Sequence, residues 1–543
     1  MKGIVIIMLK LTEIKIPLDA DSGALRRSAA KLLRCAESDI LSVSVTKKAV
    51  DSRKKDDIFF VYNAEVELRF GDEKWFAKSG SPRVSKADPI VFPEPELRRT
   101  SPLRPVVAGF GPSGIFAALT LARSGLRPIV LERGRDADRR AADVQRFWQT
   151  RRLDKNSNVQ FGEGGAGTFS DGKLTTGIKD PLCRKVFLEL ADKGAPGKIL
   201  YDAKPHIGTD RLKSVVKNFR KEIIDLGGEV LFESRLTDII IANKAVHGVT
   251  YEDASGKSAD IETDALLLCV GHSARDTIET LHRVGVRMEQ KPFSVGARIE
   301  HPREFIDKAQ YGKFAGHPAL GAADYKLACH PPHGRGAYTF CMCPGGTVVA
   351  ASSEAGGVVV NGMSEWARDA ENSNSALLVG IEPQDFPSEH VLSGFALQRT
   401  IEQAAFRLGG GSYAAPAQLA GDFLSGSPSA RFGGVRPSCP TGAVPSDIRL
   451  ILPKNVTDTM AAALVKMNRM LDGFAMPEAV LTAPETRSSS PVRVLRDEYR
   501  QANIIGLYPC GEGAGYAGGI VSAAVDGIRG AFAVIENVGD NPY

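Results

Sequence analysis

A glycine-rich turn between two predicted elements is the strongest chemical signal in the sequence. Gly109, Gly111 and Gly114 form the pattern G-x-G-x-x-G, directly after the apolar run 106–108. That run predicts a strand, and the spaced apolar residues after the glycines predict a helix. We expect Gly109 to permit a tight turn, Gly111 to let a pyrophosphate approach the backbone, and Gly114 to let helix and strand pack closely. The free N–H groups at the start of the helix would face the phosphates, so the pattern predicts a dinucleotide-binding site.

An acidic residue at the end of the next predicted strand narrows the choice of dinucleotide. Glu132 follows the apolar run 128–131. This position would let its carboxylate accept hydrogen bonds from a ribose diol. A carboxylate there repels a 2′-phosphate, so NADP is disfavoured, whereas FAD and NAD both remain.

Two later segments favour FAD over NAD. Residues 264–271 form an apolar run that ends in Gly271, which is typical of a buried strand that returns the chain to the cofactor. Residues 506–519 are rich in glycine, contain Glu512, and precede an apolar stretch that predicts a helix. A domain that binds only NAD has no need for such a distant segment. The ribityl chain and ring of FAD require contacts of this kind.

The elements that must position these residues belong to a globular chain. Its 543 residues predict about two to four domains. A composition of 43% hydrophobic and 24% charged residues excludes a largely disordered, collagen-like or coiled-coil chain. A net charge of +5 by itself indicates neither nucleic acid nor membrane. The longest apolar runs, 3–9 and 265–270, are far shorter than the roughly 20 residues that span a bilayer. The sparse cysteines form no disulfide framework, and Lys10 stands where a signal peptide would be cleaved, so we expect a cytoplasmic protein.

Five segments follow from these patterns. Residues 1–85 predict a small α+β domain of the order βαββ and ferredoxin-like type. Residues 86–103 hold a cluster of prolines that is typical of an extended linker. Residues 104–284 and 485–543 predict the two parts of an FAD-binding domain, and residues 285–484 predict a substrate domain inserted between them.

The sequence resembles the FAD-dependent oxidoreductases of the glutathione-reductase-like superfamily, and more narrowly the mostly uncharacterised FAD-utilising dehydrogenases of bacteria and plastids. The resemblance covers nearly the whole chain. Its motifs are NVQFGEGGAGTFSDGKL at 158–174, SVGARIEHP at 294–302, YTFCMCPGG at 338–346, RSSSPVR at 487–493 and the glycine-rich stretch 511–519. It implies an α/β fold: a Rossmann-like FAD-binding domain of glutathione-reductase type, an inserted mixed α+β substrate domain and the small N-terminal domain. It supplies no substrate.

The resemblance also implies roles for particular residues. Glu132, Arg133 and Leu236 would contact the adenosine end of FAD. Glu512 would bind the ribityl chain at a position where many relatives carry aspartate, and a helix that begins at Ile520 would stabilise negative charge on the reduced flavin. The complete expected cofactor-binding set is Gly109, Gly111, Pro112, Ser113, Gly114, Glu132, Arg133, Gly164, Gly165, Thr168, Ser170, Lys173, Leu236, Gly271, Gly511, Glu512, Gly518, Gly519 and Ile520.

Three side chains are candidates for catalysis. Arg298 or His301 could hold a carboxylate or protonate a product; a structural ion pair with Glu300 and a surface histidine are the alternatives. Cys341 and Cys343 would share one face of a strand, where Cα atoms roughly 6.5–7 Å apart do not favour a disulfide. Buried small side chains are the alternative to a functional thiol. No spacing of cysteine and histidine predicts a metal site.

These observations predict an FAD-dependent oxidoreductase or dehydrogenase, which passes hydride or electrons between a non-covalent flavin and an unidentified small molecule or protein partner. Lys173 would pair with either a cofactor phosphate or Asp171. Because only one G-x-G-x-x-G pattern has a predicted strand before it and an acid after it, NAD(P)H would bind transiently, or electrons would come from the substrate or a partner. The alternative is an FAD-containing sensory or binding protein whose N-terminal domain binds RNA or protein through the basic run 53–55. That domain lacks the aromatic pattern of RNA-binding sheets, so we expect no nucleic-acid partner.

Overall fold

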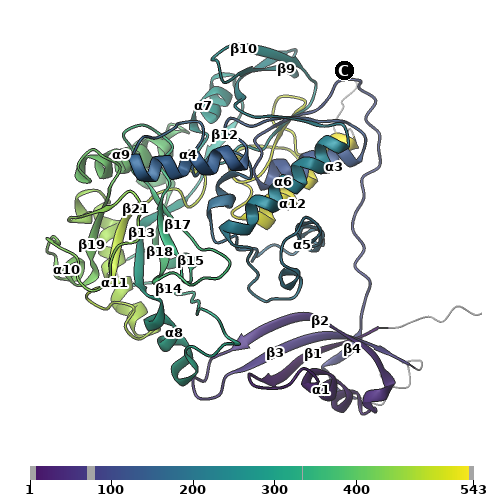
Figure 1. The fold of residues 1–543 in the computed structure, drawn as a ribbon. Coiled ribbons are helices and arrows are strands. Elements are labelled where there is room, and N and C mark those ends of the chain that lie inside the picture. Colours follow the sequence, from purple (N-terminus) through teal and green to yellow (C-terminus); the bar gives the residue numbers. More distant parts are fainter. Residues whose placement is uncertain (1–7, 70–79, 333, 537–543) are drawn as a thin grey trace, which may run out of the picture.

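The fold is taken from a computed structural model, and the structure describes residues 8–69, 80–332 and 334–536. The N-terminal part contains a four-stranded antiparallel sheet of order β2-β3-β1-β4, drawn in purple in Figure 1. Its elements are β1 (Met8–Pro17), α1 (Ala24–Leu33), β2 (Ile40–Asp51), β3 (Phe59–Leu68) and β4 (Val84–Lys86). Helix α1 buries Ala29, Ala30 and Leu33 against this sheet. Residues 87–105 form neither helix nor strand and run as one extended segment to the next sheet (Figure 1).

A parallel five-stranded sheet of order β23-β11-β5-β6-β7 carries the glycine-rich turn. Its strands are β5 (Val106–Ala108), β6 (Ile129–Leu131), β7 (Glu229–Leu231), β11 (Leu266–Leu268) and β23 (Leu507–Pro509). All five are short, and four are wholly buried. That burial explains why they read as continuous apolar runs instead of alternating patterns.

Successive side chains of this sheet face two different layers. Val107, Val130 and Leu267 pack against a layer of helices, whereas Val106 and Leu266 face the opposite layer. The helical layer consists of α3 (Pro112–Arg123), α5 (Leu182–Asp192), α6 (Thr209–Asp225) and α12 (Ile520–Ile535). The opposite layer consists of the antiparallel strands β8 (Arg235–Ala242), β9 (Ala245–Glu252) and β10 (Ser258–Glu262) with α7 (Arg275–Arg283).

A seven-stranded mixed sheet forms the third part, with the order β14-β15-β18-β13-β21-β19-β20. Its strands are β13 (Phe293–Pro302), β14 (Ala328–Cys329), β15 (Ala337–Cys343), β18 (Asn372–Ile381), β19 (Ala415–Leu419), β20 (Ala443–Pro445) and β21 (Val480–Glu485). Two-stranded ribbons join β12 (Met288–Gln290) to β22 (Val492–Val494) and β16 (Thr347–Ala350) to β17 (Val360–Met363). The remaining helices are α4 (Ala137–Thr150), α8 (Arg303–Tyr311), α9 (Ser393–Leu408), α10 (Ala420–Ser425) and α11 (Lys454–Asn468). The mixed α/β fold predicted from the sequence is confirmed.

Candidate functional site

The glycine-rich turn joins β5 to α3, and each of its three glycines meets a different constraint. Gly109 has a φ of +99°, and a Cβ there would lie 2.7 Å from the Cys269 carbonyl oxygen. A Cβ at Gly114 would lie 1.9 Å from the Gly109 oxygen, so the turn and the helix pack too closely for any side chain. At Gly111 the nearest atom to a Cβ would be the Gly165 Cα at 3.7 Å. Gly111 is therefore free of steric conflict within the protein, and the space beside it can receive a ligand.

Glu132, at the end of β6, is buried and holds three turns together. Its Oε2 accepts a hydrogen bond of 2.9 Å from the Phe110 nitrogen. Its Oε1 accepts bonds of 2.9 Å from the nitrogens of Gly134 and Gly162. A carboxylate oxygen can accept more than one hydrogen bond, so both oxygens keep acceptor capacity for a ligand. The carboxylate also faces the large cavity described next.

A cavity of about 770 Å³ extends from the glycine-rich turn to the edge of the seven-stranded sheet. Most of the residues expected to bind the cofactor line it, although they come from segments hundreds of residues apart. These residues are Gly109, Gly111, Pro112, Ser113, Glu132, Arg133, Gly165, Ser170, Lys173, Leu236, Gly271, Glu512, Gly518, Gly519 and Ile520.

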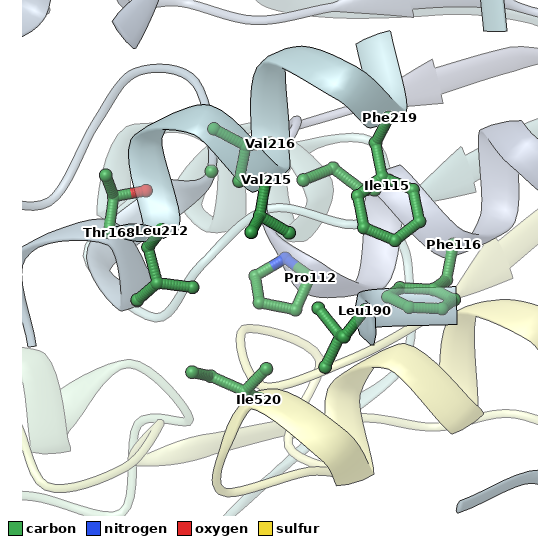
Figure 2. Close-up of a pocket in the computed structure, with 12 residues that line it drawn as sticks. Pro112, Ile115, Phe116, Thr168, Leu190, Leu212, Val215, Val216, Phe219 and Ile520 are labelled. Carbon is green, nitrogen blue, oxygen red and sulfur yellow. The ribbon is translucent and has the colours of Figure 1, made fainter. Parts of the chain in front are cut away.

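Four expected residues do not line this cavity. Gly114 lies in the close contact between turn and helix. Gly511 packs on the glycine-rich turn, because a Cβ there would lie 2.9 Å from the Ser113 Cβ. Gly164 and Thr168 face a separate apolar cavity of about 30 Å³. Figure 2 shows the small cavity between Pro112, Ile520 and the apolar side chains around them. Gly164 and Thr168 were expected to bind the cofactor, but they are not among the residues that line the large cavity.

A histidine and a carboxylate meet at the wall of the large cavity. Nδ1 of His272 lies 3.1 Å from Oε1 of Glu512. The other ring nitrogen, Nε2, is buried and has no hydrogen-bond partner among the described residues. His272 directly follows Gly271, which is the one sequence signal that could have identified it. An unpartnered buried nitrogen beside the cavity suits a bound polar ligand.

A second polar cluster lies where the cavity approaches β15. Asp171 accepts a hydrogen bond of 2.9 Å from Nε of Arg368, and Lys173 Nζ lies 2.9 Å from its other oxygen. Burial opposes ionisation of Asp171, but Lys173 and Arg368 outweigh it and hold the pKa of this carboxyl well below its usual range. Lys173 thus pairs with Asp171, one of the two alternatives that its sequence left open. Arg368, which also lines the cavity, was missed because it lies in a loop without a motif.

Arg298 is fully buried within β13 and does not line the cavity. Its guanidinium donates to Asn374 Oδ1 at 2.7 Å and to Glu485 Oε2 at 3.1 Å. The expected alternative, an ion pair with Glu300, is therefore wrong. Glu485 does line the cavity, and burial raises the pKa of its carboxyl to about 7. Sequence reasoning missed Glu485, because only the fold brings β21 beside β13.

His301 is also fully buried, so the surface alternative for this residue is wrong as well. Its Nε2 donates to the Phe474 carbonyl oxygen at 2.8 Å, and its ring packs between Phe305 and Phe474. Burial lowers the pKa of His301 to about 4, so the ring is neutral at neutral pH. His301 does not line the large cavity. The structure therefore places His301 in the interior of the protein, apart from the residues that line the cavity.

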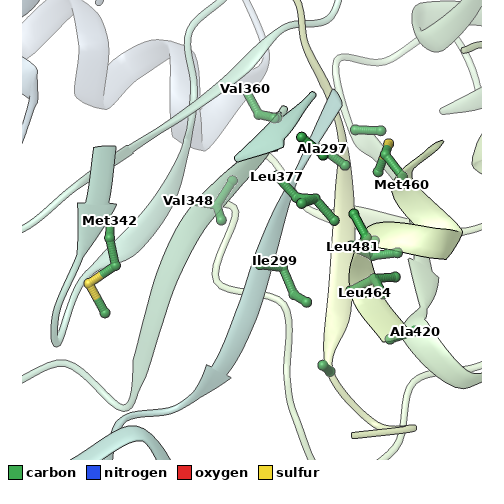
Figure 3. Packing of buried hydrophobic residues seen from close by; sticks show 14 of the residues in the cluster. Ala297, Ile299, Met342, Val348, Val360, Leu377, Ala420, Met460, Leu464 and Leu481 are labelled. Carbon is green, nitrogen blue, oxygen red and sulfur yellow. The ribbon is translucent and has the colours of Figure 1, made fainter. Parts of the chain in front are cut away.

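Cys341 lines the cavity, but not as a member of a regular strand. The pairing of β15 with β18 shifts between Phe340 and Cys343, so β15 contains one extra residue. Cys341 has a φ of +41°, in the left-handed region that residues other than glycine rarely adopt. Met342, between the two cysteines, belongs to the large hydrophobic cluster around the seven-stranded sheet (Figure 3). The assumption that both thiols lie on one face of an extended strand is wrong because of this bulge.

A buried ionic network fixes the cavity wall to the neighbouring helices. Glu402 of α9 accepts hydrogen bonds of 2.8 Å from both Arg275 and Arg487. Burial opposes ionisation of Glu402, but the two arginines outweigh it and hold its pKa well below the usual range. Arg487 lines the cavity, so this network connects the start of α7 to the end of the seven-stranded sheet.

The described residues were compared with the requirements of a metal site and of a membrane span. Among the described residues, no group of three or more His, Cys, Asp or Glu side chains is placed to hold a metal ion. In the same part of the chain, no helix combines the length and the apolar character needed to cross a membrane.

Comparison with known proteins indicates the class of protein to which the chain belongs. Residues 292–488 match the family described as FAD-dependent protein, C-terminal domain-like, and residues 8–67 match a domain of unknown function. The chain is thus an FAD-dependent flavoprotein. An uncharacterised protein of Clostridium beijerinckii is 46% identical over 539 residues, which are 97% of this chain and 98% of that protein. The chain belongs to the same family as this clostridial protein.

Solved structures of other flavoproteins resemble the fold only distantly. The flavin-dependent brominase Bmp2 is 12% identical over 81% of this chain and 80% of its own, with a TM-score of 0.39. Glycerol-3-phosphate dehydrogenase from Bacillus halodurans, complexed with FAD, is 11% identical over 81% of this chain and 65% of its own, with a TM-score of 0.36. Glycine oxidase from Bacillus cereus is 12% identical over 81% and 96%, with a TM-score of 0.33. These similarities are too weak to bear on the reaction of this chain.

Proposed function

We propose that this chain is an oxidoreductase that binds FAD non-covalently in the large cavity and exchanges electrons with a small molecule or a protein partner. One observation carries the proposal. The glycine-rich turn, Glu132 and the N-terminus of α12 all line a single cavity, and that cavity continues past them to Lys173 and Glu485. The glycine-rich turn, Glu132 and the N-terminus of α12 suit a dinucleotide whose second half is as long as the ribityl chain and flavin ring of FAD. The part of the cavity beside Lys173 and Glu485 is left for a second reactant.

The residues present fit FAD at several points. At Gly111 the space that a side chain would fill is open toward the cavity, as close approach of a pyrophosphate requires. Glu132 and Leu236 would hold the adenosine end. Glu512 and the unpartnered His272 Nε2 would face the ribityl chain and ring. Gly519 is the residue before α12, whose N-terminal dipole would lie beside the flavin.

Bound FAD supplies hydride and electron transfer, and the chain supplies charge and protons around it. The N-terminus of α12 favours negative charge beside Ile520. Burial alone would lower the pKa of Lys173, but Asp171 outweighs this effect and raises it, so the ammonium stays charged at the cavity wall. Glu485, whose pKa burial raises to about 7, can hold or release a proton at this wall near neutral pH.

The source of electrons separates two forms of the proposal. NAD(P)H would bind transiently over the flavin, or electrons would come directly from the substrate or a protein partner. Only one G-x-G-x-x-G pattern, at 109–114, has a strand before it and an acid after it, which favours the absence of a dedicated nicotinamide domain. Stopped-flow reduction by NADH and NADPH distinguishes the forms. Fast reduction that saturates at low micromolar nicotinamide would contradict the absence of a dedicated site.

Purified recombinant protein tests the proposal directly. We expect it to be yellow, with flavin released on denaturation in an amount equimolar with the chain. Protein stripped of flavin should recover the same spectrum when FAD is added. Colourless protein that also fails to take up added FAD would overturn the central claim.

The competing function, a binding protein whose N-terminal domain takes up RNA, has less support. RNA-binding sheets of this size stack bases on exposed aromatic side chains. Here Phe60 is only 6% exposed and belongs to the hydrophobic cluster of the seven-stranded sheet. On the neighbouring strand, Lys48 pairs through its backbone with Tyr201 and Ala203. Filter binding of RNA by the full chain at two salt concentrations tests this function, because phosphate-driven affinity falls steeply with salt.

A further inference from the structure

The bulge in β15 brings two thiols into a setting that the proposed flavin chemistry does not use. Cys341 faces the large cavity, whereas Cys343 is fully buried directly behind it. Cys343 Sγ donates to the Cys341 carbonyl oxygen at 3.2 Å, so the buried thiol folds back toward the residue that faces the cavity. In a regular strand the Cα atoms of residues two apart lie roughly 6.5–7 Å apart, which does not favour a disulfide. Here, in contrast, Cys341 is left-handed and β15 contains one extra residue.

Two cations lie against this pair of thiols. Nη2 of Arg298 lies 2.8 Å from the Cys341 carbonyl oxygen and 3.6 Å from Cys343 Sγ. Lys173 Nζ bonds to the carbonyl oxygen of Met342, the residue between the cysteines. Positive charge beside a thiol favours the thiolate, which is the form that attacks disulfides.

The two cysteines differ in accessibility and in protonation. The interaction with Cys343, together with the charges of Lys173 and Arg298, lowers the pKa of Cys341, although burial and Asp171 oppose this. The same interaction and burial raise the pKa of Cys343. Cys341 is thus the nucleophile that a molecule in the cavity meets first. Cys343 is the protonated second thiol, which needs only to reach Cys341.

We propose that Cys341 and Cys343 form a reversible dithiol–disulfide site in the cavity wall, which exchanges with low-molecular-weight disulfides. This proposal goes beyond the proposed oxidoreductase function. It requires no bound cofactor, so it stands or falls independently of FAD binding.

The exchange balances in two steps. The Cys341 thiolate attacks one sulfur of an external disulfide, a new S–S bond forms, the external S–S bond breaks, and one thiolate leaves and takes up a proton. Cys343 then gives its proton to solvent and attacks Cys341 Sγ, which expels the second external thiolate. Two protein thiols are oxidised to one disulfide, and one external disulfide is reduced to two thiols.

Intact-mass analysis of the reduced full chain after incubation with hydroxyethyl disulfide, a small uncharged probe, tests the proposal. We expect the wild-type chain to lose the mass of two hydrogens without a retained adduct, and peptide mapping to link Cys341 to Cys343. Cys343→Ser should instead retain one hydroxyethylthio group on Cys341, and Cys341→Ser should show neither product at these two positions. Cys439→Ser is the matched control, because Cys439 is buried elsewhere in the core and should behave as wild type.

Several results would overturn the proposal. They are a wild-type chain that keeps both thiols reduced, a wild-type chain that retains the adduct on Cys341, and a Cys343→Ser chain that forms no adduct. Thermal unfolding of each variant is measured alongside. If serine at position 343 lowers the melting temperature, Cys343→Ala replaces it, and the expected adduct on Cys341 is the same. Flavin content is measured on the same samples, so failure to bind FAD is recorded separately from failure to exchange.

Discussion

The carboxylate of Glu132 accepts a hydrogen bond of 2.9 Å from the backbone nitrogen of Phe110, inside the glycine-rich turn. The residue expected to bind the ribose is therefore also the residue that fixes the shape of the turn. Because the same carboxylate serves Gly134 and Gly162, it links the ends of β5 and β6 to the loop before Gly165. We therefore expect ligand binding and the local structure of the turn to depend on the same side chain.

Replacement of Glu132 by alanine should weaken FAD binding by about ten- to a hundredfold. A charge-assisted hydrogen bond contributes about 1.5–3 kcal/mol, and about 1.4 kcal/mol corresponds to one decade of affinity. The loss of the Phe110 contact should add to the effect by loosening the turn. Flavin retained through extensive dialysis, followed by titration with FAD, measures it. Cys341→Ser is the control and should keep its flavin; the reverse pattern would mean that the cofactor site lies on other residues.

Gly111 and Gly114 should respond to substitution in opposite ways. Gly111→Val should lose flavin more completely than Glu132→Ala, because the branched side chain would occupy the space of the pyrophosphate, yet the flavin-free protein should unfold near the wild-type temperature. Gly114→Ala should destabilise the fold itself by about 1–3 kcal/mol or more, since its Cβ would lie 1.9 Å from the Gly109 oxygen. Thermal unfolding with and without FAD separates the two effects. Equal stability of both flavin-free variants would argue against this geometry.

Alkylation of Cys341 by iodoacetamide should depend on pH with a midpoint well below the ordinary value of about 9, because its pKa is lowered. The thiolate is the reactive form, so the rate should rise with pH and level off above this midpoint. Groups that face the thiol and shift its titration are Cys343, Lys173, Arg298, Asp171 and Glu485. Lys173→Met should move the midpoint upward. Cys183, whose pKa is raised mainly by burial, serves as the internal comparison in the same peptide map. A midpoint for Cys341 near the ordinary value of about 9 would contradict the prediction.

The buried His301 should make the fold sensitive to mild acid. Its pKa is about 4 in the folded chain and 6.5 ordinarily, so the unfolded chain binds the extra proton between these values. Stability is therefore complete above about pH 6.5 and falls by about 3 kcal/mol as the pH approaches 4. His301→Gln should flatten this part of the curve of melting temperature against pH. His206, whose pKa burial also lowers to about 4, should leave a residual slope. A curve unchanged by His301→Gln would show that this ring is not buried as a neutral group.

The glycine-rich turn was predictable from the sequence because its constraints are local. Strand β5, the three glycines and helix α3 follow one another within a few residues, so spacing alone places Gly114 against Gly109. Wholly buried parallel strands can also be recognised locally, because each one appears in the sequence as a continuous apolar run. The acid at the end of β6 belongs to the same unit. For this reason the sequence by itself determined the dinucleotide motif and the α/β class.

The rest of the site was decided by contacts between segments that are distant in the chain. His272 meets Glu512 only because β11 pairs with β23, and Glu485 meets Arg298 only because β21 pairs with β13. No periodicity encodes which segments become neighbours, because pairing depends on the packing of whole layers. The surroundings of Cys341 could not be predicted from the sequence for the same reason. The sequence indicates a regular alternating strand there, whereas the pairing of β15 with β18 contains a bulge of one residue, and Cys341 lines the cavity while Cys343 does not.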